Sequence, residues 1–251
     1  MRRFKRTYIV VGLALAAALA LPTASWATHP GHVFQANISL LGKAKPDERT
    51  PASFFFGLAG ADDPATPSPV PPRAQTIAVL VDKGVKVSTK GLKPCTANLE
   101  GTTSEQAQAA CPKSVAGTGT ATAAIGTNFV SGTVTALIGP NNTIIGHVRI
   151  EALGATQIIP VLIQPASDQS LYRQQLFINV PPLAGGAGSL TALNITIQKK
   201  VKKKKKSGKK KVFSLFSAEC TDGVWSFLNN ETYSDHEPIS EQVNQTCKKK
   251  K

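Results

Sequence analysis

Apolar and polar residues alternate in short runs along most of the chain, and this alternation constrains its fold more than any other feature. A period of two places successive side chains on opposite faces of a strand, so each run can bury one face. With a spacing of about ten residues and Gly or Pro between the runs, the pattern predicts an all-β, antiparallel β-sandwich. The candidate strands are 34–40, 53–58, 77–81, 85–89, 115–125, 157–164, 176–180, 190–198, 212–219, 224–233 and 240–246.

Two further segments carry local signals. The β-rich runs 130–138 and 143–152 flank the turn cluster Gly139–Asn142, which predicts a β-hairpin. The segment from Thr102 to Cys111 predicts one short helix at about 102–110, because Thr102 and Glu105 fit a capping box and several alanines follow. One sandwich domain is favoured over two domains divided near 92–112.

The first 27 residues are typical of a secretory signal peptide. Arginines and a lysine precede an apolar stretch from Ile9 to Leu21, Pro22 ends it, and small residues precede the expected cleavage after Ala27. The stretch is shorter than a membrane span of about 20 residues, and no later stretch reaches that length. The general secretory route is favoured over the twin-arginine route. Residues 28–247 are then the secreted domain, and 248–251 form a basic tail.

Four cysteines lie in the predicted mature chain. An even number of cysteines in an exported protein predicts disulfides, and four cysteines allow three pairings. Cys95–Cys111 and Cys220–Cys247 are favoured because these pairs close short loops around one local segment. No CxxC or Cys/His spacing typical of zinc is present, so no metal and no cofactor are predicted.

Three segments resemble a known family. "CPKSVAGTGTATA", "FINVPPLAGGAGSLTALNITIQKK" and "GKKKVFSLFSAECTDGVWSF" are similar to segments of uncharacterised secreted β-rich proteins of soil actinobacteria. The likeness covers most of residues 76–247. It implies a β fold and export, and it leaves the function open because no activity is established for that family.

The formal net charge of +14 is concentrated in a few segments. The signal peptide, the lysine run from Lys199 to Lys211 and the tail hold 18 of the 29 basic residues, which leaves 11 basic against 15 acidic residues in the body. Like charges within one run repel each other and stay solvated. The lysine run is therefore predicted to be a long hairpin loop without packed structure. Its members are Lys199, Lys200, Lys202, Lys203, Lys204, Lys205, Lys206, Lys209, Lys210 and Lys211.

This lysine run has two interpretations. It is either a loop that charge keeps in water, or a contact for anionic cell-wall polymers or lipid head groups, to which each lysine near the surface contributes about 1 kcal/mol. Nucleic acid is a less suitable partner, because few aromatic residues interleave with the lysines and lysine lacks the planar fork of arginine. The resulting hypothesis is a secreted, non-catalytic binding or surface-structural protein, outside the cell or on its envelope.

Catalytic signals are missing from the sequence. It contains no GxSxG elbow, HExxH, P-loop or dinucleotide fingerprint, so no catalytic residue is predicted, and an extracellular hydrolase with an unrecognised site is the enzymatic alternative. His29 and His32 could bind copper near the mature N-terminus, although an ordinary frayed terminus is favoured. His147 is interpreted as a structural residue within a strand.

Aromatic residues suggest one more alternative. Trp225, Phe227 and Tyr233 would share one face of the predicted strand 224–233, as in a carbohydrate-binding module. Core packing is the favoured explanation for the same three residues.

Overall fold

The computed structural model describes residues 31–43, 48–61, 72–186, 188–204, 208, 210–234 and 236–248. The predicted signal peptide, His29 and the end of the basic tail lie outside these residues. So do three members of the lysine run, Lys205, Lys206 and Lys209.

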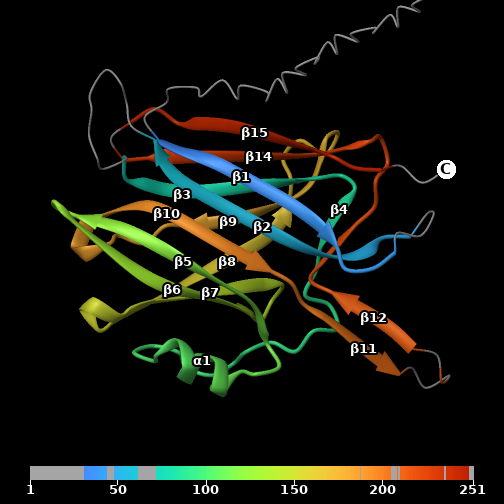
Figure 1. Cartoon of the computed structure of the whole chain (residues 1–251), viewed down its shortest axis with the longest axis horizontal. Helices are drawn as coiled ribbons and strands as arrows, with labels where there is room; N and C mark the ends of the chain where they lie inside the picture. Colours follow the sequence, from blue (N-terminus) through green and yellow to red (C-terminus); the bar gives the residue numbers. More distant parts are fainter. Residues whose placement is uncertain are drawn as a thin grey trace, which may run out of the picture.

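Most described residues belong to one 13-stranded antiparallel sheet, which confirms the predicted fold class (Figure 1). Its path runs β15-β14-β3-β9-β8-β7-β6-β5-β10-β2-β13-β4, with β1 also paired to β2. The strands are β1 (Gly31–Leu40), β2 (Thr50–Ala61), β3 (Ala74–Asp82), β4 (Val85–Val87), β5 (Val115–Ile125), β6 (Asn128–Ile138), β7 (Thr143–Ile150), β8 (Ala155–Pro165), β9 (Tyr172–Asn179), β10 (Gly188–Ile197), β13 (Phe216–Ala218), β14 (Val224–Tyr233) and β15 (Ile239–Thr246).

This sheet folds over into two layers (Figure 1). Strands β1, β2, β10, β5 and β6 form one layer, and β15, β14, β3, β9, β8 and β7 form the other. The predicted hairpin, which is β6 and β7, joins the layers. Strands that precede residue 92 pair with strands that follow residue 112, since β2 pairs with β10 and β3 with β9 and β14. The segment 92–112 therefore does not separate two sheets.

Aromatic rings fill the space between the layers at one end. Phe54 of β2 stacks on Phe216 at 4.8 Å between ring centroids and lies 5.7 Å from Phe227 of β14. Buried and partly buried residues alternate strictly along β14. Trp225, Phe227 and Tyr233 are among the buried ones. These three side chains present no face to a ligand, so the carbohydrate-binding interpretation is wrong and core packing accounts for them.

Side chains close the gap between the two end strands, β1 and β15. The path from β1 to β15 contains an odd number of strands, all paired antiparallel, so these two strands run in the same direction. Glu241 Oε2 accepts from Phe34 N at 2.7 Å. Gln245 uses its whole carboxamide: its Oε1 accepts from Ile38 N at 2.7 Å and its Nε2 donates to Ile38 O at 2.9 Å. Three backbone groups on the free edge of β1 therefore find partners without a backbone ladder.

The predicted helix is α1 (Ser104–Ala110), and its cap differs from the prediction by one residue. Thr103, not Thr102, is the N-cap, and it forms a reciprocal capping box with Gln106. Thr102 Oγ1 instead donates to Leu99 O at 2.7 Å. Cys95–Cys111 joins the end of α1 to the loop before it, and Cys220–Cys247 joins the segment between β13 and β14 to the residue after β15, so both predicted pairs are present. Two 3-10 turns, η1 (Glu151–Leu153) and η2 (Ala184–Gly186), complete the fold.

Candidate functional site

Part of the lysine run forms a two-stranded antiparallel sheet of its own, β11 (Lys200–Lys204) with β12 (Lys210–Ser214). We call these residues the lysine ribbon. It projects from the body beyond the end of β10 (Figure 1). The prediction of a loop without packed structure is wrong here, because the apolar pair Val201 and Phe213 lies near the base of the ladder and packs against the main core.

Phe213 secures the ribbon to the body. Its ring lies against Gly91, whose positive φ of 80° suits glycine, and a Cβ added there would lie 2.2 Å from Phe213 Cδ1. The ammonium groups of Lys203 and Lys211 lie 5.8 and 5.0 Å from the centre of the same ring. Cation–π attraction therefore holds two lysines over one aromatic side chain.

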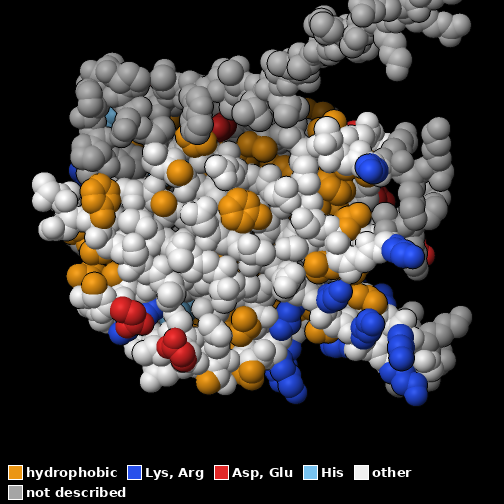
Figure 2. Space-filling model, in the orientation of Figure 1, with side chains coloured by type: hydrophobic (Ala, Val, Ile, Leu, Met, Phe, Trp, Pro, Cys, Tyr) orange, Lys and Arg blue, Asp and Glu red, His pale blue; other side chains and the backbone are white. Residues whose placement is uncertain are grey.

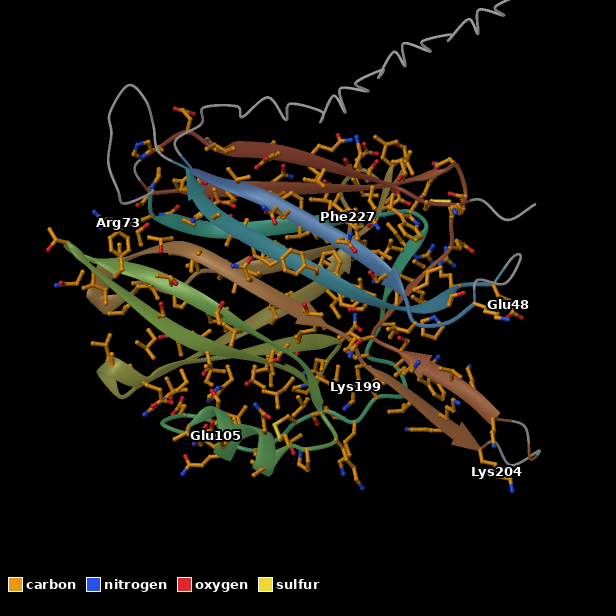
Figure 3. The ribbon with its side chains drawn as sticks, in the orientation of Figure 1. Glu48, Arg73, Glu105, Lys199, Lys204 and Phe227 are labelled. Carbon is orange, nitrogen blue, oxygen red and sulfur yellow. A yellow bond between two sulfur atoms is a disulfide. The ribbon has the colours of Figure 1, made fainter. Side chains whose placement is uncertain are left out.

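Lys199 and Lys200 donate hydrogen bonds to the body of the protein. Lys199 Nζ donates to Val115 O at 2.7 Å, and burial lowers the pKa of this ammonium group. Lys200 Nζ donates to Leu41 O at 3.1 Å. These two members of the predicted anion-binding set therefore mainly position the ribbon, and Lys199 marks its junction with the sheet in Figure 3.

The remaining ribbon lysines are exposed on both faces. Lys203 lies opposite Lys211 and Lys204 lies opposite Lys210, and like charges facing each other across two strands destabilise a ladder. Within the described part of the chain, none of these lysines forms an ion pair with a carboxylate. Figure 2 shows blue side chains gathered over the ribbon and its base. Five exposed ribbon lysines donate no hydrogen bond from their ammonium group to the described part of the body: Lys202, Lys203, Lys204, Lys210 and Lys211.

A second polar arrangement is buried near the opposite end. His32 Nδ1 lies 2.7 Å from Glu231 Oε2, and His32 Nε2 lies 2.8 Å from Leu190 O. Glu231 also accepts from Tyr233 OH at 2.5 Å and from Asn229 Nδ2 at 2.6 Å. We call His32, Glu231, Tyr233 and Asn229 the buried polar cluster. The interpretation of His32 as part of a frayed terminus is wrong, because it lies in β1 and is buried.

The hydrogen bonds define the protonation of this cluster. A carbonyl oxygen only accepts, so His32 Nε2 donates to Leu190, and Nδ1 donates to the Glu231 carboxylate. Burial alone lowers the pKa of His32, but the hydrogen bond and charge of Glu231 outweigh it and raise that pKa above 6.5. Burial alone raises the pKa of Glu231, but the same partner holds it below 4.5. Both ring nitrogens are occupied, so the ring offers no lone pair to act as a base.

The structure also places the other histidine that the sequence singled out. His147 is fully buried in β7, and its Nε2 lies 3.0 Å from Thr102 Oγ1. Desolvation lowers the pKa of His147, in agreement with its interpretation as a structural residue. Among the described residues, no three His, Cys, Asp or Glu side chains converge in an arrangement that could hold a metal ion.

An apolar cavity of about 140 Å³ lies between the two layers. We call it the interlayer cavity. Strands of both layers contribute to its wall, among them Phe56 of β2, Val148 of β7, Leu176 of β9 and Leu193 of β10, and the atoms facing it are apolar. Leaving such a volume unfilled costs a fold about 3 kcal/mol, because side chains around a void lose contacts. The alternation of apolar and polar residues did not indicate this cavity.

Comparisons with known proteins give no relative for this chain. No family model, no curated protein and no solved structure matches it. Its two disulfides fit an oxidising compartment outside the cytoplasm. Within the described ranges, we find no helix of the length and apolarity that a membrane crossing needs.

Proposed function

We propose that this chain is a secreted, non-catalytic binding protein that attaches to anionic polymers of the cell envelope through the lysine ribbon. The observation that carries the proposal is the ribbon itself: a projecting two-stranded sheet whose opposed lysines repel each other and have no acidic partner among the described residues. An anionic polymer that lies along the ribbon would relieve this repulsion.

The chemistry of the ribbon favours a polymer over a small anion. Lysine is a point charge without the bidentate geometry that recognises a single phosphate or carboxylate. Each ammonium group near an anionic surface contributes about 1 kcal/mol, and the attraction decays over roughly 8 Å at physiological ionic strength. Several lysines on both faces of one ribbon therefore suit a flexible chain of repeated negative charges.

Two further observations support a secreted protein without catalysis. The signal peptide expected at the N-terminus, the resemblance to secreted actinobacterial proteins and the two disulfides all favour export. The buried polar cluster, which brings a histidine and a carboxylate together, is closed to solvent, and both ring nitrogens of His32 are engaged. It therefore fits a structural role better than that of a general base.

The test compares retention on purified cell wall and on phosphocellulose against increasing NaCl. One variant replaces the five exposed ribbon lysines with Gln, and its matched control replaces the same five with Arg, which keeps the charge. We expect the wild type and the Arg variant to elute at similar salt and the Gln variant to elute much earlier. Circular dichroism checks that all three proteins keep the fold. Elution of the Gln variant together with the wild type would refute the attachment.

A further inference from the structure

An open groove of about 550 Å³ lies at the surface where β4 meets the end of β8 and the start of β9. We call it the edge groove. Its volume lies within the range of about 300–1,000 Å³ that is typical of small-molecule sites. Cationic, amide and apolar side chains line it together, and the described residues of its wall include no carboxylate. This mixture of side chains limits the class of ligand that the groove can bind.

Two carboxamide groups hold the walls of the edge groove in place. Gln174 Oε1 accepts from Val87 N at 2.8 Å, and its Nε2 donates to Val87 O at 3.0 Å. This side chain takes the place of a further strand beside β4, the last strand of the sheet path. Asn142 Oδ1 accepts from Thr89 Oγ1 at 3.1 Å, and its Nδ2 donates to Ile163 O at 3.4 Å. The groove is therefore formed before any ligand arrives, which lowers the cost of binding.

Two cations in the groove have no partner. Lys86 of β4 and Arg173 of β9 are exposed, and within the described ranges their side chains form neither an ion pair nor a hydrogen bond. The third cation, Lys83, lies 3.5 Å from Asp222 Oδ2, and Asp222 does not line the groove. The planar guanidinium group of Arg173 can bind a carboxylate through two parallel hydrogen bonds, which the lysines of the ribbon cannot do. The groove therefore favours a ligand with a carboxylate.

The other side chains of the groove suit a sugar ring. Gln164 Oε1 accepts from Gln175 Nε2 at 2.9 Å, and the amide group of Gln164 has no acceptor among the described residues. Gln169 is exposed, so its carboxamide can both donate and accept. Carboxamides of this kind can bind the hydroxyl groups of a sugar. Pro165 adds an exposed apolar surface against which the C–H groups of the ring can pack.

The edge groove lies close to the lysine ribbon. β4 and the ribbon are at the same end of the molecule (Figure 1). Contacts connect the two sites, because Phe213 of the ribbon lies against Gly91, and Thr89 in the same loop bonds to Asn142 of the groove. A polymer chain that lies along the ribbon can therefore continue into the groove.

We propose that the edge groove binds one acidic sugar unit, a hexuronate, of the anionic polymer that the ribbon attracts. The carboxylate pairs with Arg173, the ammonium group of Lys86 adds to the attraction, and the hydroxyls bond to Gln164 and Gln169. This inference rests on the proposed attachment for its polymer, and it adds specificity. The ribbon attracts any polyanion, whereas the groove selects polymers that contain sugar acids.

The first test titrates the mature protein with glucuronate, glucose and acetate and follows backbone amide signals by NMR. Glucuronate should shift the signals of groove residues with a dissociation constant of about 1 mM, which is usual for a ligand of this size. Glucose lacks the carboxylate and acetate lacks the ring, so each should bind about tenfold more weakly or worse. Equal binding of acetate would indicate a general anion site, and equal binding of glucose would show that charge has no role. Either result, or no shift in the groove with glucuronate, would overturn the proposal.

The second test removes the two unpaired cations. Arg173→Gln and Lys86→Gln should each weaken glucuronate binding about two- to fivefold, the range expected for an exposed ion pair. Lys113→Gln is the matched control, because Lys113 is exposed and lies outside both the groove and the ribbon. The control should bind as the wild type does, and circular dichroism checks that all variants are folded. Folded groove variants with wild-type affinity would contradict the site.

The third test separates this proposal from the attachment through the ribbon. The variant with Gln at the five exposed ribbon lysines should lose retention on phosphocellulose and keep its affinity for glucuronate. The double variant Arg173→Gln/Lys86→Gln should elute from phosphocellulose close to the wild type and elute earlier from immobilised polygalacturonate. If the double variant elutes with the wild type from both, the groove proposal is wrong while the attachment stands. If the ribbon variant is retained as the wild type is while glucuronate binds in the groove, the attachment is wrong and the groove stands.

Discussion

Glu231 gives the sharpest prediction about stability. It accepts hydrogen bonds from three buried side chains and carries the negative charge opposite His32. Glu231→Leu keeps a side chain of similar size but leaves the His32, Tyr233 and Asn229 donors without their acceptor. Removing one partner of a buried ion pair costs about 3–5 kcal/mol. A domain with roughly 5–15 kcal/mol of total stability would lose a fifth or more of it.

The cost should depend on pH. The raised pKa of His32 means that its contribution is complete below about 6.5 and is lost as pH rises through its value in the folded protein. The lowered pKa of Glu231 means that its contribution is complete above about 4.5 and is lost as pH falls through its folded value. The pair therefore stabilises most between these limits, and the difference between wild type and Glu231→Leu should shrink in alkaline solution.

Urea denaturation of both proteins at pH 5.5 and pH 9 measures this difference. His32→Leu and the double variant complete a mutant cycle, and we expect the double variant to lose less stability than the sum of the two single losses. A loss below about 1 kcal/mol at pH 5.5, or the same loss at both pH values, would refute the assignment of a charged buried pair.

Three other perturbations have expected outcomes. Replacing Cys220 and Cys247 with Ser should lower the free energy of unfolding by about 3.5 kcal/mol, from the loop of 27 residues that they close, and a urea curve like that of the wild type would contradict this. Gln245→Leu should lower the free energy of unfolding by about 2–4 kcal/mol and speed amide exchange at Ile38, because the backbone N–H and C=O of Ile38 lose their partner. Unchanged exchange at Ile38 would argue against the closure of β1 on β15. Phe213→Ala should speed amide exchange in β11 and β12 with little change in melting temperature, and a global loss of stability would show that the ribbon is not a separate unit.

The strands were predictable from the sequence because each carries its own alternation. The bounds of 115–125 and 224–233 agree with β5 and β14 to the residue. The lysine run was misjudged for a physical reason: charge repulsion opposes packing, but one apolar cross-strand pair, Val201 with Phe213, was enough to form a ladder at its base. Apolar residues at both ends of a charged run are a signal that could have indicated this ribbon.

The buried polar cluster and the cavity could not be derived from local pattern. His32 and Glu231 are 199 residues apart in the sequence, and only the fold brings them together. The cavity depends on how two layers face each other, which alternation does not determine. Gly146 inside β7 is the one local hint, since glycine weakens a strand and needs an explanation there.

The salt dependence of binding to purified cell wall tests the central claim most directly. The dissociation constant is measured for the wild type and for the variant with Gln at the five exposed ribbon lysines, over a series of NaCl concentrations. Counterion release predicts a linear relation between the logarithms of affinity and salt, with a slope that falls by nearly one for each lysine removed from contact. We predict a steep slope for the wild type and a much shallower one for the variant. Equal slopes for the two proteins would contradict attachment through the lysine ribbon.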